Sequence, residues 1–247
     1  MQSHDDLNLG EVRPVSAPTN LQSDLNNLDT WSETNSMSLN PKKCKAMYFC
    51  FMRTPPEMPP LTLGGQTLSI VKQAKLLGLH IRSDLRWSDQ VDAMVTKGSR
   101  RLFFLKRLRR AGVPLPDLIT VYCGYIRPTL EYATPCWNAG LTRRESDRIE
   151  RVQKRACRVM LGRQYLSYSD ALLTLDLQSL SQRRLTLCQD FALAVTKAGR
   201  HAPWLPPARN PSHHMQLRHT RQYKLPTGTK RYLSSPVPTI LNLLNAL

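Results

Sequence analysis

Residues 88–110 read SDQVDAMVTKGSRRLFFLKRLRR, and this stretch decides the fold of the larger part of the chain. Its apolar residues recur every three or four positions, which predicts an amphipathic helix. They are Val91, Met94, Val95, Leu102, Leu105 and Leu108. Ser88 is a candidate N-cap, and Gly112-Val-Pro114 is expected to end the helix, because glycine and proline are common just past a helix C-terminus.

The same stretch is strongly basic, with cations and no acid between residues 97 and 110. The cations are Lys97, Arg100, Arg101, Lys106, Arg107, Arg109 and Arg110. Because the leucines take one face of the helix, the cations should cover much of the remaining surface. That arrangement suits a phosphate backbone, whereas a solvated basic face without a ligand is the alternative.

Helical patterns continue beyond residue 112. A second helix should open with Pro116 in its first turn and be broken or kinked at Pro128. A capping box at residues 142–145 starts a third helix, which should end at Gly162. Ser179 caps a fourth helix. The apolar positions expected in the third and fourth helices are Ile149, Val152, Ala156, Val159, Met160, Leu185, Leu187, Phe191 and Val195.

The third helix carries a second group of cations. They are Arg143, Arg144, Arg148, Arg151, Lys154, Arg155 and Arg158. The acids Glu145, Asp147 and Glu150 alternate with them, and their spacing predicts salt bridges between residues three or four positions apart. We therefore expect this group to bind an anionic ligand less strongly than the first.

Residues before 88 show strand and turn signals around one helix. That helix should follow Pro18 and Thr19, with Leu21, Leu25, Leu28 and Trp31 on one face. Residues 44–51 are a candidate buried strand, and residues 74–81 predict another. Between them, Gly64-Gly65 supplies the positive φ angles of a two-residue hairpin turn. The sequence thus predicts an α+β fold, with short antiparallel strands first, a helical bundle after residue 88, and a basic, poorly ordered tail.

Charge indicates which partners are plausible. The 247 residues contain 35 Lys and Arg against 18 Asp and Glu, a formal net charge of +17. This imbalance predicts a polyanionic partner, with nucleic acid as the default. No apolar run approaches the roughly 20 residues that span a bilayer, so no membrane partner is expected.

The six cysteines favour reduced thiols over a metal site. No pair has Cys-x-x-Cys spacing, and no histidine lies at ligand spacing from a cysteine, which makes zinc improbable. Most of them stand in apolar contexts, as small hydrophobic residues do. Reduced thiols fit an intracellular location, in the nucleus, the cytoplasm or both.

Several strings resemble the reverse transcriptases of non-LTR (LINE-type, jockey-like) retrotransposons. One is Trp31 followed by Leu39-Asn40-Pro41-Lys42-Lys43, with the adjacent carboxylates Asp5-Asp6 upstream. The others lie in the helical part and extend the resemblance over nearly the whole chain. They are RLFFLKRL at 101–108, YIRPTLEYA at 125–133, PCW at 135–137 and ERVQKRA at 150–156.

The resemblance implies an assignment for each part of the chain. Residues 1–87 would be a truncated palm with a primer-grip-like hairpin at residues 73–78. Residues 88–200 would be a thumb-like domain that grips the template–primer duplex, and residues 201–247 a basic tail. Tyr125, Tyr132 and Trp137 could stack on bases, although positions in the core are the favoured interpretation.

The resemblance also implies catalytic roles. Asp5 and Asp6 would be two of the Mg²⁺ ligands of an RNA-directed DNA polymerase, and Lys42 or Lys43 would lie near the incoming nucleotide. The fingers and the first palm carboxylate of that family would precede Met1. We therefore expect no polymerisation by this chain alone, no bound Mg²⁺ or other cofactor, and at most nonspecific binding of a template–primer duplex.

Two alternatives stay open from the sequence. The chain could be a host protein that kept the basic helical module purely for binding nucleic acid. It could also be a pseudogene-derived product without a function.

Overall fold

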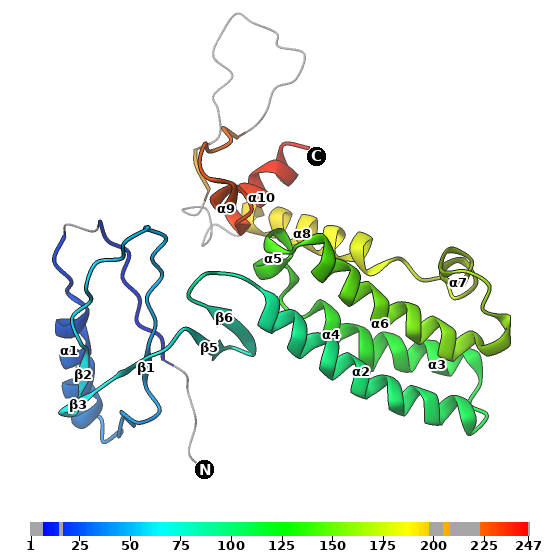
Figure 1. The fold of residues 1–247 in the computed structure, drawn as a ribbon, viewed down its shortest axis with the longest axis horizontal. Coiled ribbons are helices and arrows are strands. Elements are labelled where there is room, and N and C mark those ends of the chain that lie inside the picture. The colour runs from blue at the N-terminus through cyan, green and yellow to red at the C-terminus, as the bar shows by residue number, and fades with distance from the viewer. Residues whose placement is uncertain (1–6, 15–16, 198–204, 208–222, 247) are drawn as a thin grey trace, which may run out of the picture. The chain divides into compact units, whose positions relative to one another are not determined.

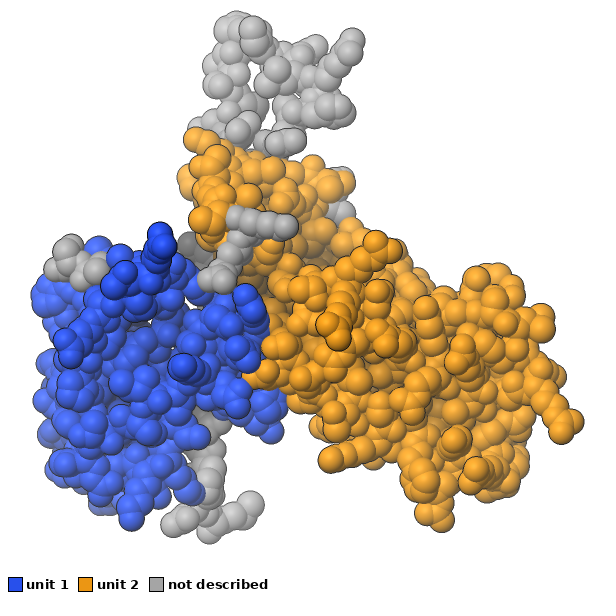
Figure 2. Space-filling view, viewed as in Figure 1, with its two compact units in different colours: residues 1–86 blue, residues 87–247 orange. Residues whose placement is uncertain are grey.

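The computed structural model describes residues 7–14, 17–197, 205–207 and 223–246. The chain divides into two compact units, unit 1 (residues 1–86) and unit 2 (residues 87–247), coloured blue and orange in Figure 2. Unit 1 combines one helix with short strands, and the described part of unit 2 is helical, so the chain is α+β (Figure 1). Asp5 and Asp6 lie outside the described residues.

The described part of unit 1 contains helix α1 and three two-stranded sheets. The elements are α1 (Leu21–Thr34), β1 (Lys45–Ala46), β2 (Thr62–Leu63), β3 (Gln66–Thr67), β4 (Ser69–Ile70), β5 (Gln73–Leu76) and β6 (Leu79–Arg82). Strand β1 pairs with β4 in parallel, while β2–β3 and β5–β6 are antiparallel hairpins. The predicted glycine turn is confirmed, since Gly64 and Gly65 join β2 to β3 with φ of 53° and 72°.

Two strand predictions in unit 1 are wrong. The single strand predicted for residues 74–81 is the hairpin β5–β6, because Leu77 and Gly78 adopt positive φ angles of 46° and 83° and reverse the chain. A hairpin at this place is what the resemblance at residues 73–78 implied. The buried strand predicted for residues 44–51 is reduced to β1, and Phe49 and Phe51 are exposed. Aromatic content alone therefore misidentified a surface segment as a buried strand.

A small core holds α1 against β2. It consists of Leu25, Ala46, Leu61, Leu63 and Leu68. The side chain of Gln22 donates to the carbonyl of Thr62 at 2.9 Å and accepts from the amide of Thr62 at 2.8 Å. The amide side chain thus takes the place of a neighbouring strand beside β2. Trp31, which was expected on the inner face of α1, is exposed.

The described part of unit 2 is built from helices. They are α2 (Ser88–Arg110), α3 (Leu115–Val121), the π-helix η1 (Tyr122–Ile126), α4 (Arg127–Glu131), α5 (Thr134–Trp137), the 3₁₀ turn η2 (Asn138–Gly140), α6 (Arg143–Leu161), the 3₁₀ turn η3 (Gly162–Gln164), α7 (Tyr168–Thr174), α8 (Leu180–Lys197), α9 (Lys230–Leu233) and α10 (Pro236–Leu244). Leu105, Leu118, Ile126, Leu130 and Ile149 are fully buried between them.

Helix α2 ends as predicted, at Arg110, but the N-cap prediction is wrong. The N-cap is Trp87, which makes no side-chain capping bond, and Ser88 is the first helical residue. Beyond the helix, Gly112 has a φ of 81°. The amide of Gly112 donates to the carbonyl of Arg109, and the amide of Val113 donates to the carbonyl of Leu108. This pair of bonds is the Schellman motif that glycine favours past a helix end.

Helices α2 and α6 run side by side in the same direction (Figure 1). Arg148 pairs with Asp92 and Arg155 donates to Ser99, so both contacts join residues 56 positions apart. A constant offset along two helices requires that they be parallel. The capping box predicted for α6 is present, with Thr142 and Glu145 bonding to each other's backbone amides.

The break predicted at Pro128 takes the form of a π-helix. Proline has no N–H and cannot bond to the carbonyl of residue 124, so the helical ladder is interrupted at this turn. The chain responds with η1 and then continues as α4. A second break follows at Ala133, whose φ of 51° separates α4 from α5.

The C-terminal part of the chain departs from prediction. Residues 223–246, expected to form a loose tail, include α10, which packs on α8 through Ala192, Ile240, Leu241 and Leu244. Helix α7 was not predicted; its N-cap Ser167 accepts from the amide of Asp170.

The register of α8 also differs from prediction. Leu185 is exposed and Arg184 is buried in its place, donating to Asn138 Oδ1 at 3.1 Å and to Ser146 Oγ at 2.6 Å. Burial lowers the pKa of the Arg184 guanidinium.

Gly98 offers a test of the helix packing. A Cβ placed there would lie 2.9 Å from Leu130 Cδ2 and 3.2 Å from Val152 Cγ1, and Leu130 is fully buried. We expect Gly98→Ala to lower the free energy of unfolding by about 1–3 kcal/mol, because overpacking outweighs the gain in helix propensity. The matched control is Gly124→Ala, whose Cβ would meet nothing within 4 Å. Urea unfolding followed by circular dichroism would compare them, and equal stabilities would contradict close packing at Gly98.

Candidate nucleic-acid interface

The cations of α2 occupy the sides of the helix that the core leaves free. Val91, Leu102 and Leu105 are buried on the inner side. The exposed cations of the helix are Lys97, Arg100, Lys106, Arg107, Arg109 and Arg110. Three of them, Arg107, Arg109 and Arg110, stand in the last turn, where the helix dipole favours positive charge.

Of the fourteen cations in the two predicted groups, Arg148 alone forms an ion pair with another described residue. The ion pairs of the described chain join Glu11 to Arg13, Asp84 to Arg82 and Arg86, Glu131 to Arg127 and Arg183, and Asp92 to Arg148. The positive charge of α2 and α6 is therefore largely uncompensated by acids within the fold.

Two of the three acids of α6, Glu145 and Glu150, bond away from its arginines. Glu145 closes the capping box with Thr142, and Glu150 accepts from the backbone amides of Leu180 and Ser181, each at 3.0 Å. Glu150 also accepts from the hydroxyl of Tyr168. The predicted salt bridges within α6 are thus absent among the described residues, and the second basic group is less neutralised than its sequence indicated.

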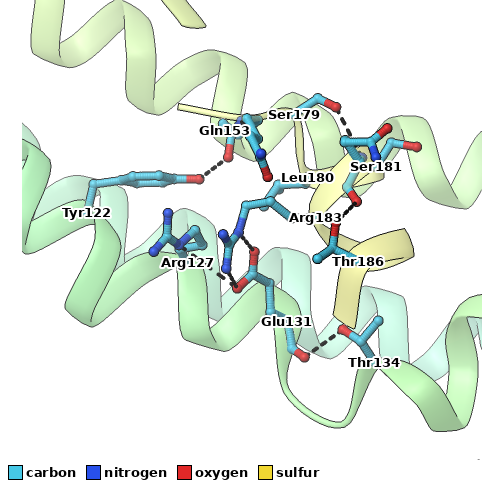
Figure 3. A network of polar contacts seen from close by, with 12 residues as sticks. Tyr122, Arg127, Glu131, Thr134, Gln153, Ser179, Leu180, Ser181, Arg183 and Thr186 are labelled. Atoms are coloured by element: carbon cyan, nitrogen blue, oxygen red, sulfur yellow. Dashed lines mark hydrogen bonds and ion pairs between the residues drawn. The ribbon is translucent and has the colours of Figure 1, made fainter. Parts of the chain in front are cut away.

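A polar network continues from this point into the core (Figure 3). The hydroxyl of Tyr122 donates to Gln153, which donates to Tyr168 at 2.9 Å and to the carbonyl of Gln178 at 2.8 Å. Burial raises the pKa of both tyrosine hydroxyls, and the bond to Glu150 adds to the effect at Tyr168. The network ties η1, α6, α7 and α8 together with neutral phenols.

A second acid is held between helices in the same region. Glu131 at the end of α4 accepts from Arg183 of α8 at 2.5 and 3.0 Å, with Arg127 at 3.9 Å (Figure 3). Glu131 raises the pKa of Arg183. Both Glu131 and Glu150 therefore act as links between helices.

Cations from α2 and α6 share one surface, which we call the basic face. Because Arg148 and Arg155 contact α2, the α6 positions next to them on the helix also border α2. The basic face comprises Arg100, Lys106, Arg107 and Arg110 of α2 with Arg144, Arg151, Arg155 and Arg158 of α6. The two rows run parallel, and at their far end Arg109 lies beside Gly162.

Four predicted cations lie elsewhere. Arg101 is on the opposite flank of α2, where it donates to the carbonyl of Tyr125 and to Thr129 Oγ1, and its guanidinium stacks 4.1 Å from the Tyr125 ring. Lys154 lies over the ring of Tyr168 at 5.0 Å. Lys97 is exposed on the Arg101 flank, and Arg143 is exposed at the start of α6.

The aromatic residues divide differently from the prediction. Trp137 is fully buried, as expected for the core. Tyr125 and Tyr132 are 45% and 53% exposed, so the core interpretation is wrong for both. Phe103 and Phe104, which the sequence analysis did not single out, are also exposed. Their place on the cationic side of α2, outside its leucine stripe, is the sequence signal that could have revealed them.

The catalytic candidates Lys42 and Lys43 lie in a described part of unit 1. Lys42 and Lys43 are exposed in a turn between α1 and β1, where Asn40 Oδ1 accepts from the amide of Lys42 at 3.1 Å. Among the described residues, no three His, Cys, Asp or Glu side chains gather in a way that could hold a metal ion. Asp5 and Asp6, the predicted Mg²⁺ ligands, lie outside the described residues.

No protein-family model, no curated protein and no solved structure matches this chain. A search of the described helices finds none with the length and apolar character needed to cross a membrane. The class of protein that the geometry defines is a helical module with a basic face on two parallel helices.

The role of Glu150 can be tested against Asp147, an exposed acid one turn earlier on α6. Glu150→Gln should lower the free energy of unfolding by roughly 1–3 kcal/mol, because a charged acceptor for two α8 amides is lost. Asp147→Asn should change it by less than about 0.5 kcal/mol. Urea titrations of both variants would measure the difference, and similar losses would argue against a linking role for Glu150.

Proposed function

We propose that unit 2 binds the phosphate backbone of a nucleic-acid duplex through the basic face, without reading its sequence. The observation that supports this is the alignment of two parallel rows of cations that form no ion pairs within the described chain. Arginine and lysine side chains in such rows displace the counterions that condense on a duplex. Nonspecific binding follows because phosphates carry no sequence information.

The dimensions of α2 are compatible with this ligand. A helix of 23 residues is about 34 Å long at 1.5 Å per residue, which is close to one turn of a duplex. Arg100 and Arg107 lie two helical turns apart on the same side of α2, so they can contact phosphates at separate points along the groove edge.

We further propose that this module is the thumb-like part of an RNA-directed DNA polymerase of the non-LTR retrotransposon class. The support is the set of strings in the sequence, above all Leu39–Lys43 and residues 125–133. In that class, Asp5 and Asp6 would bind Mg²⁺ and Lys42 or Lys43 would approach the incoming nucleotide. The host-retained binding module would use the same basic face, and both proposals share the binding test.

The salt dependence of binding tests the basic face. We expect Arg100, Arg107, Arg144 and Arg151, changed together to Gln, to flatten the slope of log K against log[salt] by roughly 3–4, because each phosphate contact contributes about 0.9. Affinity for a DNA–RNA duplex of about 20 base pairs would be measured by fluorescence anisotropy at several salt concentrations.

The control removes the same amount of charge elsewhere. Arg53, Lys72, Lys197 and Lys224 are exposed cations outside the basic face. Changing these four to Gln should leave most of the slope in place. If both quadruple variants flatten the slope equally, net charge and not the basic face determines binding.

A further inference from the structure

An open apolar hollow lies on the flank of α2 that carries Arg101. Its lining residues are Phe104 of α2, Val121 at the end of α3, and Gly124 and Tyr125 of the π-helix, and its volume is about 350 Å³. Phe104 is 49% exposed, and its ring meets that of Tyr125 edge to face with centroids 6.0 Å apart. Two aromatic rings are therefore presented to solvent at the mouth of one hollow.

Gly124 keeps this hollow open. A Cβ at that position would meet nothing within 4 Å, and the residue does not have a positive φ. A glycine within a helix is less stable than alanine by about 1 kcal/mol, and neither a turn nor close packing requires it here. The structural effect of the missing side chain is the free space beside the ring pair of Phe104 and Tyr125.

The aromatic wall is held in place before any ligand binds. Arg101 lies over the ring of Tyr125 at 4.1 Å and also donates to the carbonyl of Tyr125 and to Thr129 Oγ1. These contacts fix the ring relative to α2 and α4. A preformed wall lowers the ordering cost of binding.

The charges beside the hollow favour a nucleotide as its occupant. Lys97 and Arg100 stand seven and four positions before Phe104, on the neighbouring turns of the same helix, and both are exposed. Neither forms an ion pair with a described residue. Aromatic rings next to cations match a base next to its phosphates. An apolar protein segment would use the rings but leave these cations without a counter-charge.

We propose that the hollow stacks one unpaired nucleobase of a strand that leaves the duplex bound on the basic face. This inference rests on the proposed function, since the basic face supplies the duplex. It adds a substrate preference, namely a duplex with a single-stranded extension over a blunt duplex. The nucleobase and the duplex would contact different sides of α2. The hollow lies on the Arg101 flank, and Arg100 and Arg107 lie on the solvent side of α2, between the hollow and α6.

The test compares a blunt 20-base-pair duplex with the same duplex carrying a five-nucleotide overhang, by fluorescence anisotropy at one salt concentration. We expect the unmodified protein to bind the overhang substrate about tenfold more tightly, as one base stacked on an aromatic ring provides. An overhang of abasic nucleotides, which keeps the phosphates, should lose this advantage.

Gly124→Leu is the main variant, because it should fill the hollow while raising helix propensity. A second single variant is Phe104→Ala. Each of the two variants should abolish the preference for the overhang substrate and leave the affinity for the blunt duplex unchanged. Phe103→Ala is the matched control, since Phe103 is exposed on α2 but does not line the hollow. Urea unfolding of Gly124→Leu checks that the fold is intact, and Phe104→Ala provides a second test if it is not.

The outcomes separate the two proposals. Three outcomes would overturn the stacking site alone. The unmodified protein could bind the blunt and overhang substrates equally, or bind the abasic overhang as tightly as the overhang that carries bases. The preference for the overhang could also survive in both Gly124→Leu and Phe104→Ala. An apolar protein segment would then be the better candidate for the hollow. Failure to bind the blunt duplex would overturn the proposed function and, with it, the inference that rests on it.

Discussion

At Gly98 the backbone of α2 comes so close to Leu130 of α4 and Val152 of α6 that a methyl group would overlap Leu130. This approach lets α2 and α6 pack in parallel along most of their length, with contacts at Asp92–Arg148 and Ser99–Arg155. The other features of unit 2 depend on that alignment. It brings two basic rows to one surface and leaves the opposite flank of α2 to pack on α4 and η1.

Charge is segregated in unit 2. Glu150 and Glu131 link helices in the interior or at its edge, and Glu145 belongs to a helix cap. The cations of the basic face form no ion pairs among the described residues, so their mutual repulsion opposes folding to a modest degree at low salt. The fold tolerates this because its core contains large side chains that are fully buried, such as Trp137, Leu105 and Ile149. An anionic ligand would relieve the same repulsion.

Local patterns predicted several elements well. The stripe of α2, its glycine stop, the capping box of α6 and the Gly64-Gly65 turn are short-range features, and each is present in the structure. Prediction failed where the outcome depended on distant contacts. Residues 44–51 have the composition of a strand but find a partner only at β1, and Leu77 takes a positive φ that its side chain disfavours. In α8, Arg184 replaces Leu185 in the core because Asn138 and Ser146 accept its hydrogen bonds.

The charge imbalance, the helical periodicity after residue 88 and the identity of the cations follow from the amino-acid sequence alone, because they depend on composition and on spacing within one segment. Which cations share a surface, which acids are withdrawn from them, and which aromatic rings face solvent depend on how the helices pack. Arg101 and Arg100 are adjacent in the chain, yet Arg101 bonds to Tyr125 and Thr129 while Arg100 is exposed on the outer face and forms no ion pair with a described residue. The physical reason is that neighbouring helix positions point about 100° apart, so the packing partner of each helix determines the role of each side chain.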